Sequence, residues 1–149
     1  MYWRPSIRKL DAEKPRHSVG PQRPRAQERV LSVSPPRAGA EIPAAEPVPL
    51  AELVNYQEGS IVSRVLVSRE AGTLTLFAFD EGQALSEHTA PFDALVQMLE
   101  GEMEISIDRK PLNAKTGDLV LMPAHRPHAL KAVTRSKMLL TMIRSQKAG

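Results

Sequence analysis

The sequence contains no cysteine, few aromatic residues and no long apolar run. Without cysteine the chain can form no disulfide bond, no thiolate metal site and no thiol nucleophile, which suits a reducing compartment. No stretch approaches the roughly 20 consecutive apolar residues of a membrane-spanning helix. The N-terminus also lacks the apolar core of a secretory signal. We therefore expect a cytoplasmic protein with no membrane partner.

The length and the overall charge restrict the organisation of the chain. Its 149 residues are enough for one ordinary domain and too few for two. Apolar residues make up 42% of the sequence, which is enough to form a core. The 20 basic and 17 acidic residues leave a mild positive charge that does not by itself indicate a nucleic-acid partner.

Proline and positive charge are concentrated in the first third of the chain. Residues 1–49 hold 9 of the 13 prolines and carry 9 basic against 5 acidic residues, whereas residues 50–149 carry 11 against 12. Frequent prolines remove backbone donors and restrict the preceding residues, so neither a helix nor a strand is sustained. Such a segment cannot offset the cost of ordering its backbone, about 1–2 kcal/mol per residue. We expect residues 1–47 to be a disordered Arg- and Pro-rich tail, followed by a folded domain over residues 48–149.

Other roles for this tail are less well supported. Tyr2 and Trp3 are of the type that stacks on bases. The arginines, however, are scattered among acidic residues, so we do not expect a nucleic-acid partner. Pro5 and Pro15 interrupt the amphipathic helix that a targeting peptide needs. A start codon assigned too early would also produce such a tail, and the protein sequence alone does not decide this.

From residue 50 onward, short apolar or alternating segments recur about every ten residues, separated by Gly, Pro and Asp turns. They cover residues 61–67, 73–79, 94–99, 103–107, 119–122, 128–133 and 137–143. Short strands at this spacing, with turn residues between them, predict an all-β sandwich or barrel. Residues 48–56 are the one segment compatible with a helical turn, and they fit an extended arm equally well.

Six residues of this region stand at characteristic distances from one another in the sequence: Gly82, His88, Gly101, Gly117, Pro123 and His128. Their order resembles the two motifs of the cupin family, in which a glycine and a histidine open the first motif and a glycine closes it. The fifteen residues between Gly101 and Gly117 also match the shortest spacer of that family. The stretch SEHTAPFDALVQMLEGE further resembles a group of small single-domain bacterial cupins. The resemblance implies a cupin-type jelly-roll β-barrel over residues 48–149.

The resemblance also implies a metal site, of which half is present. Metal-dependent cupins bind the ion through two histidines and a glutamate of the first motif and a histidine of the second; here those positions hold His88, Ala90, Ala94 and His128. The glycine of the second motif is His125, and its terminal asparagine is Ala132. Structural zinc takes four protein ligands and catalytic zinc usually three, so two histidines form a weak and open site.

Strand alternation predicts which side chains share the interior with the two histidines. A period of two places Ser86, His88 and Ala90 on one face of a strand, and the resemblance makes this face the interior. The expected pocket-lining residues are Ser86, Ala90, Ala94, Val96 and Met98. Gln97 should lie on the opposite face.

Three further polar residues lie close to the motifs in sequence. His125 is either a third ligand or an exposed residue of the rim. Asp93 and Glu87 should point away from His88, because alternation places both on the other face. A ligand supplied by a second subunit stays open as a further possibility.

We expect the barrel to bind a small molecule, a weakly held divalent transition metal (Zn, Fe, Ni, Mn or Cu), or both, in a non-catalytic or sensing role. His88 and His128 are the expected metal ligands. The alternative is a metal-dependent enzyme, similar to the dioxygenases or isomerases of the cupin group, that uses the same incomplete site. Losing half the ligand set costs catalysis more readily than binding. Two buried histidines that only form hydrogen bonds in the core are the third possibility.

The size of the domain leads to an expectation about assembly. A barrel of about 100 residues has a modest core. Its outer strands also expose edges and an apolar face. We therefore expect a homodimer, with residues 48–56 and the strand over residues 61–67 at or near the interface.

Overall fold

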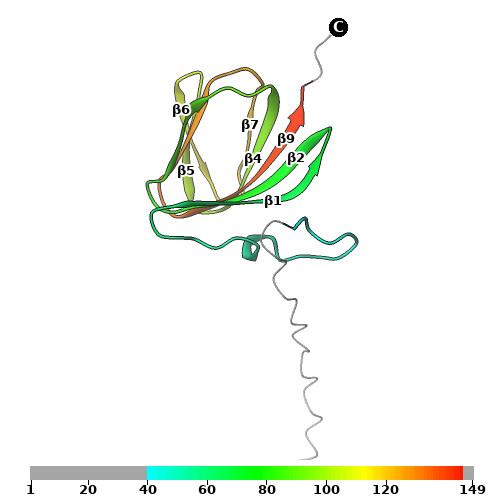
Figure 1. Cartoon of the computed structure of the whole chain (residues 1–149). Coiled ribbons are helices and arrows are strands. Elements are labelled where there is room, and N and C mark those ends of the chain that lie inside the picture. Colours follow the sequence, from blue (N-terminus) through cyan, green and yellow to red (C-terminus); the bar gives the residue numbers. More distant parts are fainter. Residues whose placement is uncertain (1–39, 146–149) are drawn as a thin grey trace, which may run out of the picture. The chain divides into compact units, whose positions relative to one another are not determined.

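The computed structural model describes residues 40–145, which form two β-sheets and an N-terminal arm (Figure 1). We call residues 40–56 the arm, and it contains the 3-10 turn η1 (Leu50–Glu52). The strands that follow are β1 (Ile61–Arg69), β2 (Gly72–Phe79), β3 (Ala84–His88), β4 (Phe92–Glu100), β5 (Glu102–Ile107), β6 (Lys110–Lys115), β7 (Leu119–Met122), β8 (His128–Ala132) and β9 (Ser136–Arg144). Residues 1–39, most of the expected tail, lie outside the described residues.

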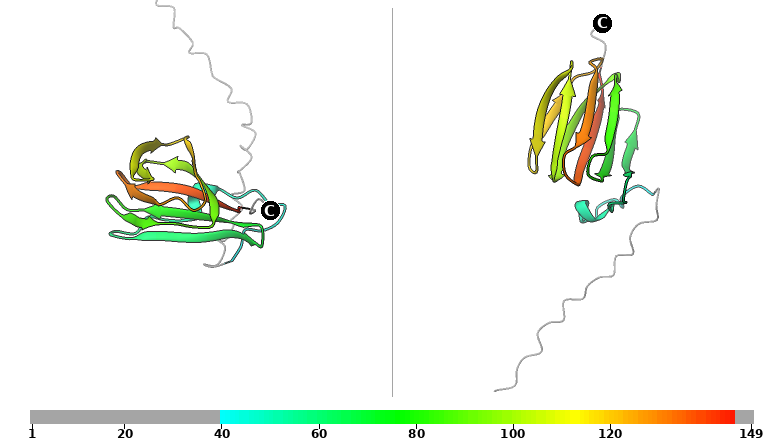
Figure 2. Two further views of the ribbon diagram at one scale, coloured as in Figure 1. Left: turned by 90° about the horizontal axis from the view of Figure 1, so that it is seen from above. Right: turned by 90° about the vertical axis from the view of Figure 1, so that its left-hand side faces the viewer.

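The strands form one sheet in the order β1-β2-β9-β4-β7 and another in the order β3-β8-β5-β6. The strand pairs are antiparallel in both sheets. Seen from above, the sheets form two layers, and the chain passes repeatedly from one to the other (Figure 2). The expected all-β jelly-roll barrel is confirmed. Within residues 40–145, no helix is long and apolar enough to span a bilayer.

The alternation of apolar residues does not predict β6. The strand is largely polar and contains Pro111 and Asn113, which are rare in strands. It lies at the edge of the four-stranded sheet, where a residue without an N–H donor is tolerated.

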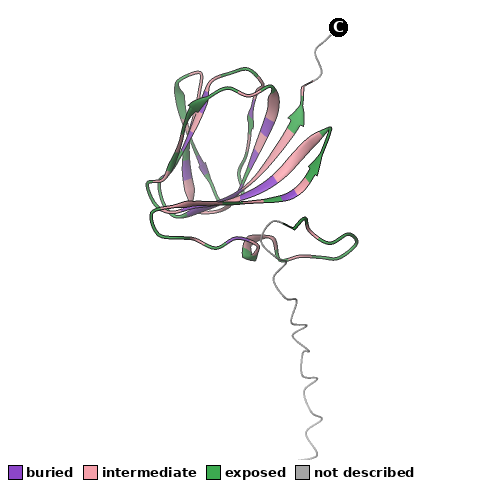
Figure 3. Cartoon of the chain, in the orientation of Figure 1, coloured by how far each residue is buried: buried purple, intermediate pink, exposed green. Residues whose placement is uncertain are grey.

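The core lies between the two sheets. On β4, Ala94, Val96 and Met98 are at most 3% exposed whereas Gln97 is exposed, so the predicted alternation holds along this strand. These residues pack in one cluster with core residues of both sheets, among them Phe79, Met103, Ile105, Leu130 and Met138. Figure 3 shows buried residues along the strands of both sheets.

A second apolar cluster lies on the outer face of the five-stranded sheet, under the arm. Leu66, Leu76 and Ala78 are fully buried there with Val54 of the arm. Ile42 also packs on this cluster, and its N–H donates to the carbonyl oxygen of Leu66 at 3.1 Å. Residues 40–47, which sequence reasoning assigned to the tail, therefore contact the barrel.

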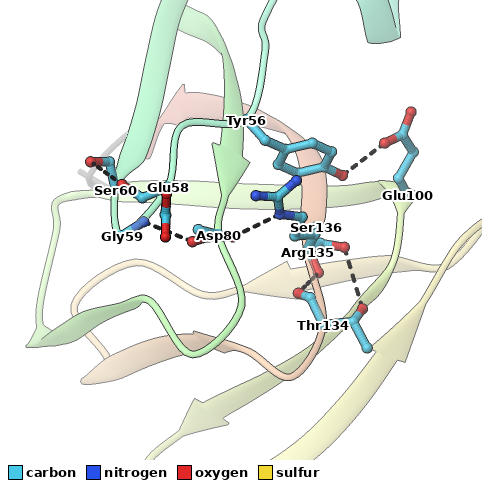
Figure 4. A network of polar contacts seen from close by, with 9 residues as sticks. All are labelled: Tyr56, Glu58, Gly59, Ser60, Asp80, Glu100, Thr134, Arg135 and Ser136. Atoms are coloured by element: carbon cyan, nitrogen blue, oxygen red, sulfur yellow. Dashed lines mark hydrogen bonds and ion pairs between the residues drawn. The ribbon is translucent and has the colours of Figure 1, made fainter.

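Polar contacts from three residues hold the arm against the sheet. The Tyr56 hydroxyl donates to Glu100 at 2.7 Å, and the Arg135 guanidinium lies 5.4 Å from the centre of the tyrosine ring (Figure 4). The ammonium group of Lys137, a residue that is largely buried, lies 5.0 Å from the same ring centre and donates to the carbonyl oxygen of Ala51 at 2.6 Å. Cations over an aromatic ring are attracted by its negative face, so Tyr56 interacts favourably with both.

Asp80 fixes the turn between the arm and β1. Its carboxylate accepts from the Gly59 N–H at 2.7 Å and from Arg135 Nε at 2.8 Å (Figure 4). The hydrogen bond from the Gly59 N–H has the larger effect and the one from Arg135 the smaller, and together they hold the pKa of Asp80 below its usual range. A lowered pKa means that this carboxylate stabilises the fold above about pH 4, and that its contribution is lost as the pH falls further.

Replacing Tyr56 by Phe keeps the ring and removes the hydroxyl that donates to Glu100. Loss of one such hydrogen bond should lower the free energy of unfolding by about 1 kcal/mol, or about 4–8 °C in melting temperature for a domain of this size. Burial, followed by the hydrogen bond to Glu100, raises the pKa of Tyr56. Its contribution is therefore complete below about pH 10 and is lost at higher pH.

Melting curves followed by circular dichroism at pH 7 and above pH 10 test this expectation. The gap between the wild-type and Tyr56→Phe proteins should narrow as the pH rises above 10. Tyr2→Phe, which changes the other tyrosine of the chain, is the matched control and should melt with the wild type. Equal melting temperatures of the Tyr56→Phe and wild-type proteins at pH 7 would contradict the role given to this hydrogen bond.

Candidate metal centre

His88 and His128 meet as direct partners in the four-stranded sheet. His88 is the last residue of β3 and His128 the first residue of β8. The ladder shifts between Leu85 and His88, because three steps along β3 match two steps along β8. Such a β-bulge inserts one residue and re-aims the side chains that follow it. It places His88 beside the buried His128.

The bulge corrects the expectation for Ser86. Leu85 and His88 each oppose a buried residue of β8, so both lie on the inner face, and the exposed Ser86 lies out of phase with them. Ser86 contributes its backbone carbonyl to the site and not its hydroxyl. Ala90 lies beyond the end of β3 and is half-buried. Whether a ligand reaches Ala90, Ala94, Val96 or Met98 stays a prediction.

The two imidazole rings lie edge to face, and their Nε2 atoms are 3.1 Å apart. His128 is 4% exposed, whereas His88 is exposed to solvent. The His128 ring therefore lies in the interior of the barrel, and the His88 ring lies at its surface.

The hydrogen bonds of the other ring nitrogens determine the tautomers. Nδ1 of His88 lies 2.8 Å from the carbonyl oxygen of Ser86, and Nδ1 of His128 lies 3.0 Å from that of Arg126. Because a carbonyl oxygen only accepts, each Nδ1 carries the hydrogen and donates. In the neutral rings both Nε2 atoms then hold lone pairs, and at 3.1 Å these lone pairs repel unless a cation lies between them.

This arrangement fits the nitrogen ligands of a metal ion. Two nitrogens that each lie about 2.0–2.1 Å from one ion can be at most about 4.2 Å apart. The observed 3.1 Å satisfies this limit. Metal-binding histidines also commonly donate their second ring N–H to a carbonyl oxygen, as both rings do here.

Among the described residues, 40–145, no group of three or more His, Cys, Asp or Glu side chains is arranged to hold a metal ion. Asp93 and Glu87, which alternation places away from His88, have other contacts. Asp93 accepts from the Ala124 N–H at 2.9 Å, and Glu87 lies 3.8 Å from Arg109.

His125 is a residue of the turn that connects β7 and β8. It is exposed, and its N–H donates to the carbonyl oxygen of Ala90 at 2.8 Å. Its backbone φ is +63°, in the left-handed region that favours glycine. The position where the cupin motif has a glycine therefore retains the glycine conformation in this chain. The structure favours the rim interpretation of His125 over that of a third ligand.

Two methionines near the site were missed by sequence reasoning. Ala94 pairs with Met122 on one side and with Met142 on the other, across β7, β4 and β9. Directly opposed residues of a sheet share a face, so both methionines lie on the inner face beside Ala94. Alternation within each strand could have placed them inside, but their position next to Ala94 depends on the strand order.

Comparison with known proteins agrees with this architecture. The Cupin domain family model matches residues 75–144. A conserved protein of unknown function from Streptococcus pyogenes is 35% identical, and the match covers 72% of this chain and 95% of that one, with a TM-score of 0.68. A cupin superfamily protein from Desulfitobacterium hafniense DCB-2 is 30% identical over 71% of this chain and 97% of that one, with a TM-score of 0.66. The chain belongs to the cupin family.

A further similar structure is a Cupin 2 conserved barrel domain protein from Leptotrichia buccalis. It is 43% identical over 63% of this cupin and 46% of its own chain, with a TM-score of 0.62. No curated protein matches the sequence. These relatives show the family of this chain.

Replacing His125 by Gly should stabilise this cupin, because glycine adopts positive φ without the steric cost that a Cβ imposes. We expect a gain of about 0.5–1 kcal/mol in the free energy of unfolding, measured by urea denaturation. His125→Ala is the matched control, because it removes the ring but keeps the Cβ, and it should show no such gain. A His125→Gly variant less stable than His125→Ala would contradict this account of the turn.

Proposed function

We propose that this cupin binds a transition-metal ion between His88 and His128 and presents the open positions of that ion to a small molecule, as a binding or sensing module. The observation that carries this proposal is the convergence of two Nε2 lone pairs at 3.1 Å, with both Nδ1 atoms committed to carbonyl oxygens. Zn, Fe, Ni, Mn and Cu are the candidate metals, since imidazole is a ligand for most of them. We propose the cytoplasm as its compartment, which the lack of cysteine supports.

The environment of the pair favours binding over catalysis. The two other family ligand positions are Ala90 and Ala94, which offer no ligand atom. The nearby carboxylates of Asp93 and Glu87 interact with a backbone N–H and an arginine, so neither is presented to the pair as a general acid or base. The alternative of a metal-dependent dioxygenase or isomerase would require turnover at an ion held by two histidines alone.

Metal binding should appear as thermal stabilisation. Metal at about 100 times its dissociation constant adds about 2.7 kcal/mol to the free energy of unfolding if the unfolded chain binds weakly. For a domain of this size the melting temperature should then rise by about ten degrees or more. The rise should fade below about pH 6, because protons compete with the metal for imidazole nitrogens. Differential scanning fluorimetry of the metal-free protein with Zn²⁺, Ni²⁺, Cu²⁺, Mn²⁺ and anaerobic Fe²⁺ measures this.

Variants of single histidines identify the ligands. His88→Ala and His128→Ala should each abolish the metal-dependent rise, whereas His125→Ala, in the neighbouring turn, should keep most of it. His17→Ala should also leave it unchanged. A melting temperature that stays flat with all five metals would contradict metal binding at this pair and leave a metal-free binding barrel.

We also propose that this cupin forms a homodimer through the part of the outer sheet face that the arm leaves open. Leu119 and Leu121 of β7 are 64% and 54% exposed, and Ile143 of β9 is 48% exposed. They alternate with the inward residues Val120, Met122 and Met142, so they share the outer face. A second copy related by a two-fold axis would present the same three side chains to these, so that each set covers the other. The sequence predicts that the arm lies at or near the interface. In the structure the arm packs against its own chain, on the neighbouring part of the same face.

Light scattering at micromolar concentration should give twice the chain mass of 16.4 kDa. Leu121→Lys should convert the dimer to a monomer, because it buries a charge at the interface. Val133→Lys changes a residue that is 43% exposed but lies after β8, and it should leave the dimer intact. A wild-type mass of one chain would exclude the proposed assembly.

A further inference from the structure

Met122 and Met142 lie at the same end of the barrel as the two histidines. His88 and Ala94 flank the connection from β3 to β4, while Met122 and His128 flank the connection from β7 to β8. The two connections are joined by the hydrogen bond from His125 to Ala90 and by the one from Ala124 to Asp93. The row of Met122, Ala94 and Met142 on one sheet therefore faces the His pair on the other.

The side chains of this row leave the two sulfur atoms as its ligating atoms. Ala94 contributes only a methyl group between the two methionines. Met122 is 2% exposed, and Met142 is half-buried against the core. A methionine side chain has three rotatable bonds and adapts to the space available. The two histidines and the two methionines therefore come from facing sheets at this end of the barrel.

Such a donor set distinguishes between metals. Thioether sulfur is a soft ligand that selects Cu(I), whereas carboxylate and carbonyl oxygens suit Mn²⁺ and other hard ions. In this chain the soft donor comes from methionine, since there is no cysteine, and the nearby carboxylates of Asp93 and Glu87 are held in other contacts. The site therefore offers soft sulfur ligands from one sheet and imidazole nitrogens, which are ligands of borderline softness, from the other.

We propose that the centre is a soft-metal site in which His88 and His128 are joined by the sulfur of Met122, Met142 or both, and that it selects Cu(I) over Zn²⁺ and Mn²⁺. This inference rests on the proposed function, because it takes the His pair as metal ligands. Met122 and Met142 are not ligand positions of the cupin motifs, and the proposed metal is copper in its Cu(I) state.

The chain provides a matched control for the methionines. Met98 and Met138 pair on the same two strands, β4 and β9, and are at most 1% exposed. They lie four residues along β4 from Ala94, a distance of about 13 Å at 3.3 Å per residue. Met→Leu changes there remove the same sulfur from the same kind of apolar environment, far from the His pair.

The experiment measures Cu(I) and Zn²⁺ affinity separately on the full-length, metal-free protein. Cu(I) is titrated without oxygen against the chromogenic chelator bicinchoninate, and Zn²⁺ against a chromogenic zinc chelator. We expect Met122→Leu/Met142→Leu to weaken Cu(I) binding about tenfold or more and to change Zn²⁺ binding by less than about twofold. Met138→Leu should change neither affinity. Leucine is close to methionine in volume, so the variants should fold, and their metal-free melting curves check this.

X-ray absorption at the copper edge of the Cu(I)-loaded wild type gives a second reading that does not depend on a variant. It should contain both nitrogen and sulfur scatterers, and the sulfur should disappear in the double variant. Cu(I) bound with nitrogen scatterers only, with an affinity that the double variant retains, would overturn this inference and leave the His pair as the site. Failure of both Cu(I) and Zn²⁺ to bind the wild type would instead overturn the proposed function, and this inference with it.

Discussion

The apolar contact between the two sheets is the interaction on which the rest of this structure depends. Val96, Met98, Met103 and Ile105 are almost completely buried and come from strands of both sheets. Because this layer is filled with side chains, the sheets hold a fixed spacing and a fixed register relative to one another. The polar residues of the candidate site lie at one end of the layer, and their positions follow from it.

The candidate site also requires a local departure from regular pairing. A regular β3 would not place both Leu85 and His88 on the inner face, because their separation of three residues reverses the side of a flat strand. The bulge restores the match with Leu130 and His128. The carbonyl groups of Ser86 and Arg126 then orient the two rings, so that backbone geometry determines which nitrogen faces inward. The candidate site is thus an oriented pair of histidines.

Much of this fold could be predicted from the sequence, because alternation and turn residues are local signals. The segments around residues 73–79, 103–107 and 137–143 became strands, and Ala94, Val96 and Met98 became buried. The bulge before His88 could not be predicted, since it depends on how β3 pairs with a strand forty residues away. The same is true of Met122 and Met142, which become neighbours of Ala94 only through the strand order. Such features belong to the assembled sheet and not to any one segment.

The arm packs on the outer face of the five-stranded sheet. Its contacts reach Leu66 and Leu76 on the strands next to it in sequence, and Glu100 and Lys137 much further along the chain. The arm therefore joins residues that lie near both ends of the described part of the chain. The outer cluster and the central core thus stabilise two opposite faces of the same sheet.

The position of β9 has a consequence for the order of events during synthesis. This strand is the last of the described chain, yet it lies in the middle of the five-stranded sheet, between β2 and β4. Until residues 136–144 have left the ribosome, the hairpin of β1 and β2 has no partner on one edge, and Lys137 is not available to the arm. The large sheet closes only once residues 136–144 have been made, so until then its strands have open edges and unburied apolar side chains.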